Sequence, residues 1–279
     1  MSFVRSLARA AVALALVLPA ATVIAADATY TPQVGQEGKD VIWVPTPENL
    51  IAKMLDMAKV TPNDIVFDLG SGDGRTVIAA AKRGAKATGI EFNPDMASLS
   101  KLNAEKAGVS ANATFINGDI FVTDFSKATV VTMYLLPSLN VKLRPTILNM
   151  KPGTRVVSHA FTMDDWKADE TASVEGRTAY FWIVPAKVAG TWTWQANNQN
   201  YEVTLAQKYQ ELTGTAMIGG KPAKLTSAKI NGDQITLTVD EGGAVREFTG
   251  RVSGSAIDGM AKAGGSAAKW AASGKLAKS

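Results

Sequence analysis

A glycine-rich turn between a short apolar run and a helix-forming segment constrains this chain more than any other feature. Residues 65–67 read Ile-Val-Phe, which is typical of a parallel strand buried on both faces of a sheet. Gly70, Gly72 and Gly74 follow at alternate positions, where glycine permits a positive φ and a close approach by a ligand. Residues 76–82 then favour a helix whose N-terminus points at whatever the turn holds. The segment therefore predicts a ligand-binding turn in an α/β domain.

The spacing of these glycines separates two classes of ligand. A dinucleotide-binding turn reads G-x-G-x-x-G, whereas this turn reads G-x-G-x-G, with Asp68 two places before the first glycine. The next strand, 87–91, ends in Glu91, and a carboxylate can accept hydrogen bonds from two ribose hydroxyls. A third strand is followed by Asn-Gly-Asp119-Ile120. Together these motifs resemble those of class I S-adenosylmethionine-dependent methyltransferases. The alternatives are turns that merely connect the elements of an ordinary α/β domain, and a nicotinamide-binding domain.

The resemblance implies a cofactor, S-adenosyl-L-methionine, and a role for each motif. Asp68 and the backbone of residues 70–74 would face its amino-acid part, Glu91 its ribose, and Asp119 with Ile120 its adenine. The full set of cofactor-binding residues that the resemblance implies is Thr46, Asp68, Gly70, Ser71, Gly72, Asp73, Gly74, Arg75, Glu91, Asn93, Asp119 and Ile120. For Asp73 and Arg75 the alternative is capping and surface charge at the start of the helix.

Alternating strand and helix patterns place residues 41–187 in one domain. Strands are expected at 65–67, 87–91, 113–116, 129–134, 155–161 and 179–184, with an acidic loop at 164–170. This alternation predicts an α/β fold with a Rossmann-like, doubly wound, mostly parallel sheet. Thr46 is a good N-cap and Pro47 a good first residue for an early helix. Residues 139–150 also have helical spacing, although Pro145 is expected to break or restart that helix.

The pattern changes after about residue 187. Short alternating runs separated by glycine turns replace helical spacing, as in residues 234–239 after an Asn-Gly-Asp hairpin signal. Residues 188–279 therefore predict a small antiparallel β-rich C-terminal domain, a half-barrel or sandwich, that ends in a low-complexity tail from residue 261.

The first residues resemble a secretory leader. Residues 1–9 contain two arginines and no acid, and residues 10–26 form an uncharged, mostly apolar run that is short for a membrane span. Residues 1–26 are thus interpreted as a signal peptide and residues 27–40 as a flexible arm. This predicts an exported protein, periplasmic or secreted, with no stable membrane span after cleavage. An uncleaved leader that anchors the chain in a membrane and an organellar presequence are the alternatives.

Composition excludes several other sites. The chain has no cysteine and one histidine, so neither a disulfide, a thiolate metal site nor a histidine-rich metal site is expected. Removal of Arg5 and Arg9 with the leader lowers the 29 basic residues to 27 against 25 acidic ones, assuming cleavage before Asp27, which leaves a net charge of +2. This charge gives no indication of a nucleic-acid partner. The oligomeric state stays open.

The methyl acceptor is suggested by a narrower resemblance. Residues 44–47, 68–75 and 149–153 resemble the branch of seven-β-strand enzymes that includes the mitochondrial ATP-synthase c-subunit lysine methyltransferase and its bacterial relatives. The resemblance implies N-methylation of protein lysine. A small-molecule acceptor, or an exported non-catalytic protein that binds S-adenosyl ligands, is the alternative. Tyr134 and His159 are the candidate catalytic residues, His159 as a general base or else as a packed, hydrogen-bonded residue.

Overall fold

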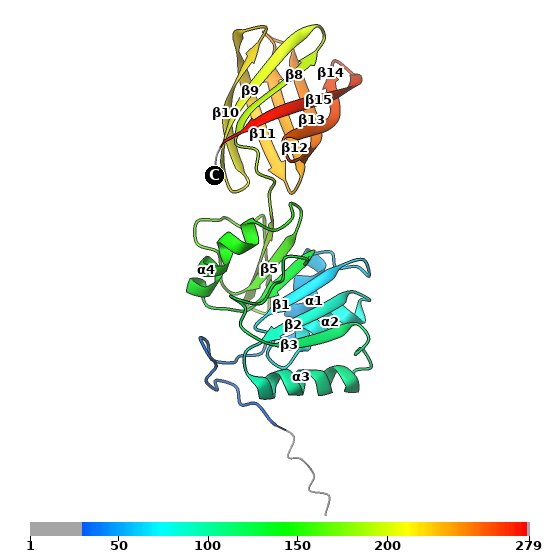
Figure 1. Cartoon of the computed structure of the whole chain (residues 1–279), viewed down its shortest axis with the longest axis vertical. Coiled ribbons are helices and arrows are strands. Elements are labelled where there is room, and N and C mark those ends of the chain that lie inside the picture. The colour runs from blue at the N-terminus through cyan, green and yellow to red at the C-terminus, as the bar shows by residue number, and fades with distance from the viewer. Residues whose placement is uncertain (1–29, 278–279) are drawn as a thin grey trace, which may run out of the picture.

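The computed structural model describes residues 30–277, which form a sheet with flanking helices followed by a β-barrel (Figure 1). The leader predicted at residues 1–26 lies outside the described residues. Between residues 30 and 277, no helix is both long and apolar enough to cross a bilayer. The predicted fold class is confirmed: a mostly parallel α/β sheet precedes an antiparallel β domain.

The sheet has seven strands in the order β3-β2-β1-β4-β5-β7-β6. Strands β1 to β7 span Ile65–Leu69, Lys86–Glu91, Ala113–Asn117, Val130–Met133, Arg155–His159, Glu170–Val174 and Arg177–Ile183. Helices α1 to α4 span Glu48–Met57, Arg75–Lys82, Pro94–Lys106 and Pro137–Leu148. Strands β1 to β5 are parallel, and β7 and β6 continue the sheet antiparallel. The carboxyl ends of β1, β2 and β4 therefore meet at one edge, where ligands of doubly wound sheets bind.

Two apolar cores lie on the two faces of this sheet. Residues of α1, α2 and α3 pack with Val66 and Val157 on one face. Residues of α4 pack with Val131, Trp166 and Trp182 on the other. Each of the central strands β1, β4 and β5 contributes apolar residues to both cores, which explains the nearly continuous apolar sequences of β1 and β4.

Two local predictions are wrong, and one strand was missed. Thr46 is not an N-cap: α1 begins at Glu48, its N-cap position is Pro47, and no side chain caps it. Pro145 neither breaks nor restarts α4, which continues through it to Leu148. The expected acidic loop is a loop as far as Asp169, but the strand that follows it, β6, was not predicted; it starts at Glu170 and pairs with β7 at the edge of the sheet.

The C-terminal domain is a closed barrel rather than a half-barrel or sandwich. Its eight strands, β8 to β15, span Gly190–Ala196, Gln199–Lys208, Glu211–Ile218, Lys221–Asn231, Gln234–Asp240, Val245–Ser253, Ala256–Ala263 and Ser266–Leu276. Closure comes from the pairing of β15 with β8. The expected low-complexity tail thus supplies the last strands, and Trp270 on β15 is buried in the core with Trp192, Trp194 and Phe248.

Residues 33–43 form a small hairpin before α1, here called the N-terminal hairpin. Gly35 N–H donates to the Trp43 carbonyl at 2.8 Å, and Trp43 N–H donates to the Gln36 carbonyl at 2.9 Å. The sequence predicts a flexible arm over residues 27–40, of which the first three lie outside the described residues. The hairpin brings residues 36–43 to the edge of the sheet where β1, β2 and β4 end.

Candidate functional site

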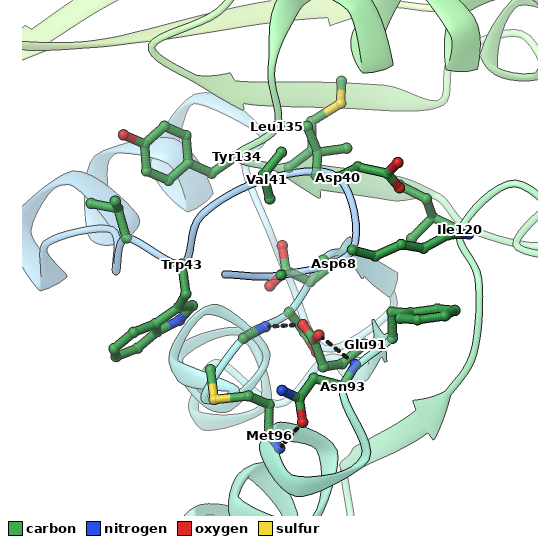
Figure 2. Close-up of a pocket in the computed structure, with 18 of the residues that line it drawn as sticks. Asp40, Val41, Trp43, Asp68, Glu91, Asn93, Met96, Ile120, Tyr134 and Leu135 are labelled. Atoms are coloured by element: carbon green, nitrogen blue, oxygen red, sulfur yellow. Dashed lines mark hydrogen bonds between the residues drawn. The ribbon is translucent and has the colours of Figure 1, made fainter. Parts of the chain in front are cut away.

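A cavity of about 630 Å³ lies at this edge of the sheet. The N-terminal hairpin, the glycine turn after β1, the end of β2, the loop after β3 and the end of β4 all contribute to its wall. Figure 2 shows Tyr134 and Leu135 on one side, Glu91, Asn93 and Met96 on the other, and Asp68 between them. The cavity thus brings together every residue that the resemblance implies for the cofactor except Gly74.

The glycine turn is built for close approach. Gly70, Gly72 and Gly74 have φ values of +78°, +55° and +83°, in the left-handed region that favours glycine. A Cβ at Gly72 would lie 2.6 Å from Nε1 of Trp43, so a side chain there has no room. The buried hydroxyl of Ser71 has no hydrogen-bond partner among residues 30–277. A cradle of bare backbone with an unpaired hydroxyl fits a polar ligand held against the turn.

Glu91 is held in place by backbone groups. Its Oε2 accepts from Gly72 N–H at 2.8 Å and its Oε1 from Asn93 N–H at 2.9 Å. Asn93 in turn caps α3 through its side chain, which accepts from Asp95 and Met96 N–H. Burial raises the pKa of Glu91. A carboxylate with one hydrogen bond on each oxygen retains acceptor capacity for a pair of hydroxyls.

Asp68, the next-to-last residue of β1, lines the cavity and is buried. Thr132 Oγ1, on the neighbouring strand β4, donates to its Oδ1 at 2.6 Å. Burial raises the pKa of Asp68 to about 7; the hydrogen bond from Thr132 lowers it, while the charges of Glu91 and Asp73 raise it. A cationic ligand group beside this carboxylate would favour its ionised form.

Three further predicted residues, Asp73, Arg75 and Asp119, form salt bridges within the protein. Asp73 forms a salt bridge with Arg75, with 2.6 Å between Oδ2 and the guanidinium. Arg75 also donates to the Thr46 carbonyl at 3.3 Å, which connects the turn to the segment before α1. Asp119 pairs with Lys39 of the N-terminal hairpin, Oδ2 to Nζ, at 2.6 Å.

Lys39 and Thr132 belong to the site but were not predicted from the sequence. Thr132 carried a signal, because it is the polar residue of an otherwise apolar strand and pairs in register with Asp68. No sequence signal marks Lys39, whose position depends on how the hairpin folds back.

The two candidate catalytic residues have different positions. Tyr134 lines the cavity, and its ring lies 6.0 Å from that of Phe161, nearly parallel to it. His159 is not part of the cavity wall: it is 1% exposed, its ring lies 3.8 Å from that of Tyr134, and its Nδ1 is 3.0 Å from Thr46 Oγ1. Burial, together with the charge of Arg177, lowers the pKa of His159 to about 4. A base this weak, separated from the cavity by Tyr134, is poorly suited to proton transfer at neutral pH.

The fold and these acidic residues at the ends of β1 and β2 and after β3 define a class I S-adenosylmethionine-dependent methyltransferase. S-adenosyl-L-methionine is its cofactor and supplies an electrophilic methyl group. Comparisons with known proteins agree. Residues 68–170 match the family model described as the ANTKMT methyltransferase domain.

Individual relatives agree with that match. The chain is 44% identical over 151 residues to a protein-lysine N-methyltransferase of Saccharolobus islandicus and covers 94% of it. It is 32% identical to the human ATP-synthase c-subunit lysine N-methyltransferase, of which it covers 64%. A solved RNA methyltransferase from Salinibacter ruber in complex with S-adenosyl-L-homocysteine is 48% identical, is covered to 96%, and superposes with a TM-score of 0.51. The chain therefore belongs to the class I methyltransferase family related to the ATP-synthase c-subunit lysine methyltransferases.

Proposed function

We propose that this chain transfers the methyl group of S-adenosyl-L-methionine to the side-chain nitrogen of lysine in a protein. The observation that carries the proposal is the 44% identity to an archaeal protein-lysine N-methyltransferase that the chain covers almost completely. The wall around Tyr134 and Phe161 supports it, because aromatic faces attract the cationic methylammonium product.

The protein's own contribution is binding, alignment and exclusion of water. The glycine turn, Asp68 and Glu91 hold the donor, and the N-terminal hairpin narrows the cavity above it. Tyr134, Leu135 and Phe161 offer an apolar path for the four-carbon stem of a lysine. Since His159 is behind Tyr134, we expect the lysine ammonium to lose its proton to solvent before attack, and the rate to rise with pH toward the pKa of lysine, about 10.4.

RNA is a second candidate acceptor, because the solved relative from Salinibacter ruber is named an RNA methyltransferase. The charge of the domain argues against it. Residues 30–187 contain 17 basic and 17 acidic side chains, so they lack the excess of positive charge by which proteins attract phosphate backbones.

The decisive experiment is transfer of a radiolabelled methyl group from S-adenosyl-L-methionine to whole-cell extract. We expect acid-stable label on protein lysine. Glu91→Ala should weaken cofactor binding by about 1.5–3 kcal/mol and lower the labelling at limiting cofactor, since it removes a charged hydrogen-bonding group. Glu105→Ala, an exposed charge on α3 outside the cavity wall, is the matched control.

Other outcomes would overturn the proposal. Label that nuclease removes and protease does not would favour RNA, and label on small molecules would favour a small-molecule acceptor. Binding of S-adenosyl-L-homocysteine without any label would favour a non-catalytic binding protein.

We also propose that the chain is exported, on the basis of the basic start and apolar run of residues 1–26. Intact-mass measurement of cytosolic, membrane and exported fractions tests this. Cleavage near residue 26 in the exported fraction is the expected result. A full-length chain in the cytosol would contradict export, and a full-length chain in the membrane would indicate an anchor.

A further inference from the structure

The loop after β5 contacts both the cavity and the barrel. Residues 160–169, here called the acceptor loop, follow β5 and lead to β6. At its start Phe161 lines the cavity beside Tyr134. Near its other end Trp166 is fully buried, and its carbonyl accepts from Trp182 Nε1 at 2.9 Å. In Figure 1 the barrel stands at the end of the molecule next to β5 and α4, the side on which this loop lies.

Helix α4 holds the first half of the acceptor loop. Asn140 Nδ2 donates to the carbonyls of Phe161 and Thr162 at 3.2 and 3.1 Å. One helical turn later, Arg144 donates to the Met163 carbonyl at 2.8 Å and to Asp165 Oδ1 at 2.6 Å. Positions four apart lie on one face of a helix, so the loop follows that face of α4.

The barrel holds the second half through the turn between β9 and β10. Tyr209 OH donates to Asp165 Oδ1 at 2.8 Å, and its ring stacks on Trp166 with centroids 5.8 Å apart. Gln210 accepts from Trp166 Nε1 at 3.0 Å and donates to the Lys167 carbonyl at 2.8 Å. Gln210 thus pairs with both the side chain of one loop residue and the backbone of the next.

Three non-glycine residues at this contact have a positive φ. Ala160 and Asp164 in the acceptor loop, and Tyr209 in the barrel turn, have φ values of +64°, +58° and +57°. The left-handed region costs a non-glycine residue about 1–2 kcal/mol. Such residues persist where the surroundings hold them, and here the surroundings are α4 and the barrel.

We propose that the barrel positions the acceptor side of the active site through Tyr209 and Gln210. These two positioning residues fix Trp166 and Asp165, and the loop then presents Phe161 to the cavity in one conformation. The inference rests on the proposed function in that Phe161 borders the lysine path. It assigns the barrel a role in the reaction although the barrel contributes no residue to the cavity wall within the described chain.

The test compares the double variant Tyr209→Ala, Gln210→Ala with the wild type in the full chain. The matched control is Thr213→Ala, Thr215→Ala, two exposed positions on the same strand, β10. Amide hydrogen exchange is measured with S-adenosyl-L-homocysteine bound, on peptides that cover residues 158–166 and, as a reference, β1. We expect exchange in residues 158–166 to accelerate about tenfold in the test variant, with β1 and the control variant unchanged, because local opening is separate from global unfolding.

A kinetic measurement accompanies the exchange experiment. The concentration of extract protein that gives half-maximal methyl labelling should rise about tenfold in the test variant, because misplacement of a substrate-positioning group weakens productive binding. The affinity for S-adenosyl-L-homocysteine should stay within about twofold of the wild-type value. Unchanged exchange in residues 158–166 would overturn the inference, as would equal acceleration in β1, which would mean general loss of stability. If the wild type labels no protein, the proposed function fails, yet the exchange result still decides whether the barrel holds the loop.

Discussion

Two buried ionisable side chains near the cavity, Asp68 and His159, respond to pH in opposite senses. The pKa of Asp68 is raised from 3.8 to about 7, so the folded protein keeps a proton that the unfolded chain releases, and stability falls as pH rises through this window. The pKa of His159 is lowered from 6.5 to about 4, so the unfolded chain binds a proton that the folded protein excludes. Stability therefore falls through His159 as pH drops from 6.5 to 4. The two effects partly cancel in the ligand-free protein.

Replacing His159 should separate these effects. In His159→Asn the contribution of Asp68 stays and that of His159 is removed. As pH falls from 6.5 to 4, the free energy of unfolding should therefore decline less steeply in the variant than in the wild type, and the two slopes should differ by up to about 1.4 kcal/mol per pH unit. Urea unfolding at several pH values measures this slope. Thr46→Val removes the hydroxyl that contacts Nδ1 but keeps the imidazole, so it should cost about 1 kcal/mol at every pH. Equal slopes in the wild type and His159→Asn would show that His159 does not titrate abnormally.

At the scale of the element, the sequence predicted best what is local. The glycine turn and the strands around it follow from short patterns, because an apolar run and the permitted φ of glycine depend on few neighbours. The pairing of Thr46 with His159 and the passage of α4 through Pro145 could not be predicted this way. Both depend on packing against segments remote in the sequence, which overrides local preference.

Prediction of the barrel from local sequence patterns is limited in the same way. Alternating residues predicted its strands, but closure depends on pairing between β8 and β15, whose sequences carry no mark of each other. The small residues of β15 resembled a low-complexity tail. One of them, Gly274, is needed because a Cβ there would lie 2.7 Å from the ring of Trp192.

The contact between the glycine turn and the N-terminal hairpin can be tested as a unit. Gly72→Ala should lose stability and affinity for S-adenosyl-L-homocysteine, because it combines a positive φ with a clash against Trp43. In a Trp43→Ala background the same change should retain only the left-handed cost, about 1–2 kcal/mol. Chemical denaturation and calorimetric titration of the wild type, the two single variants and the double variant form a double-mutant cycle, which gives the coupling energy between positions 72 and 43.

A control for this cycle is available within the same domain. Gly176→Ala has a similar φ, +75°, and open space around the new Cβ, so it should show the backbone cost with no coupling to Trp43. Additive effects of Gly72→Ala and Trp43→Ala would mean that the hairpin does not pack on the turn in solution.

At the scale of the molecule, the chain is two domains joined by a short linker and a small contact. The barrel core has no member in common with the two cores of the sheet domain. A closed barrel also leaves no unpaired strand edge, so its backbone hydrogen bonds do not depend on the other domain. The contact at Tyr209 and Gln210 is small and combines hydrogen bonds with one ring stack on Trp166, which makes it suited to positioning a loop.

This separation predicts two thermal transitions in calorimetry of the full chain. S-adenosyl-L-homocysteine at 100 times its dissociation constant should stabilise the sheet domain alone, by about 2.7 kcal/mol, because it binds only the folded form of that domain. Gly274→Ala should lower only the transition temperature of the barrel, since its Cβ would press on Trp192 inside the barrel. Ser273→Ala, an exposed position on the same strand, should lower neither transition temperature. A single transition that shifts with both the ligand and Gly274→Ala would show that the two domains unfold together. The acceptor loop would then couple the domains in stability as well as in position.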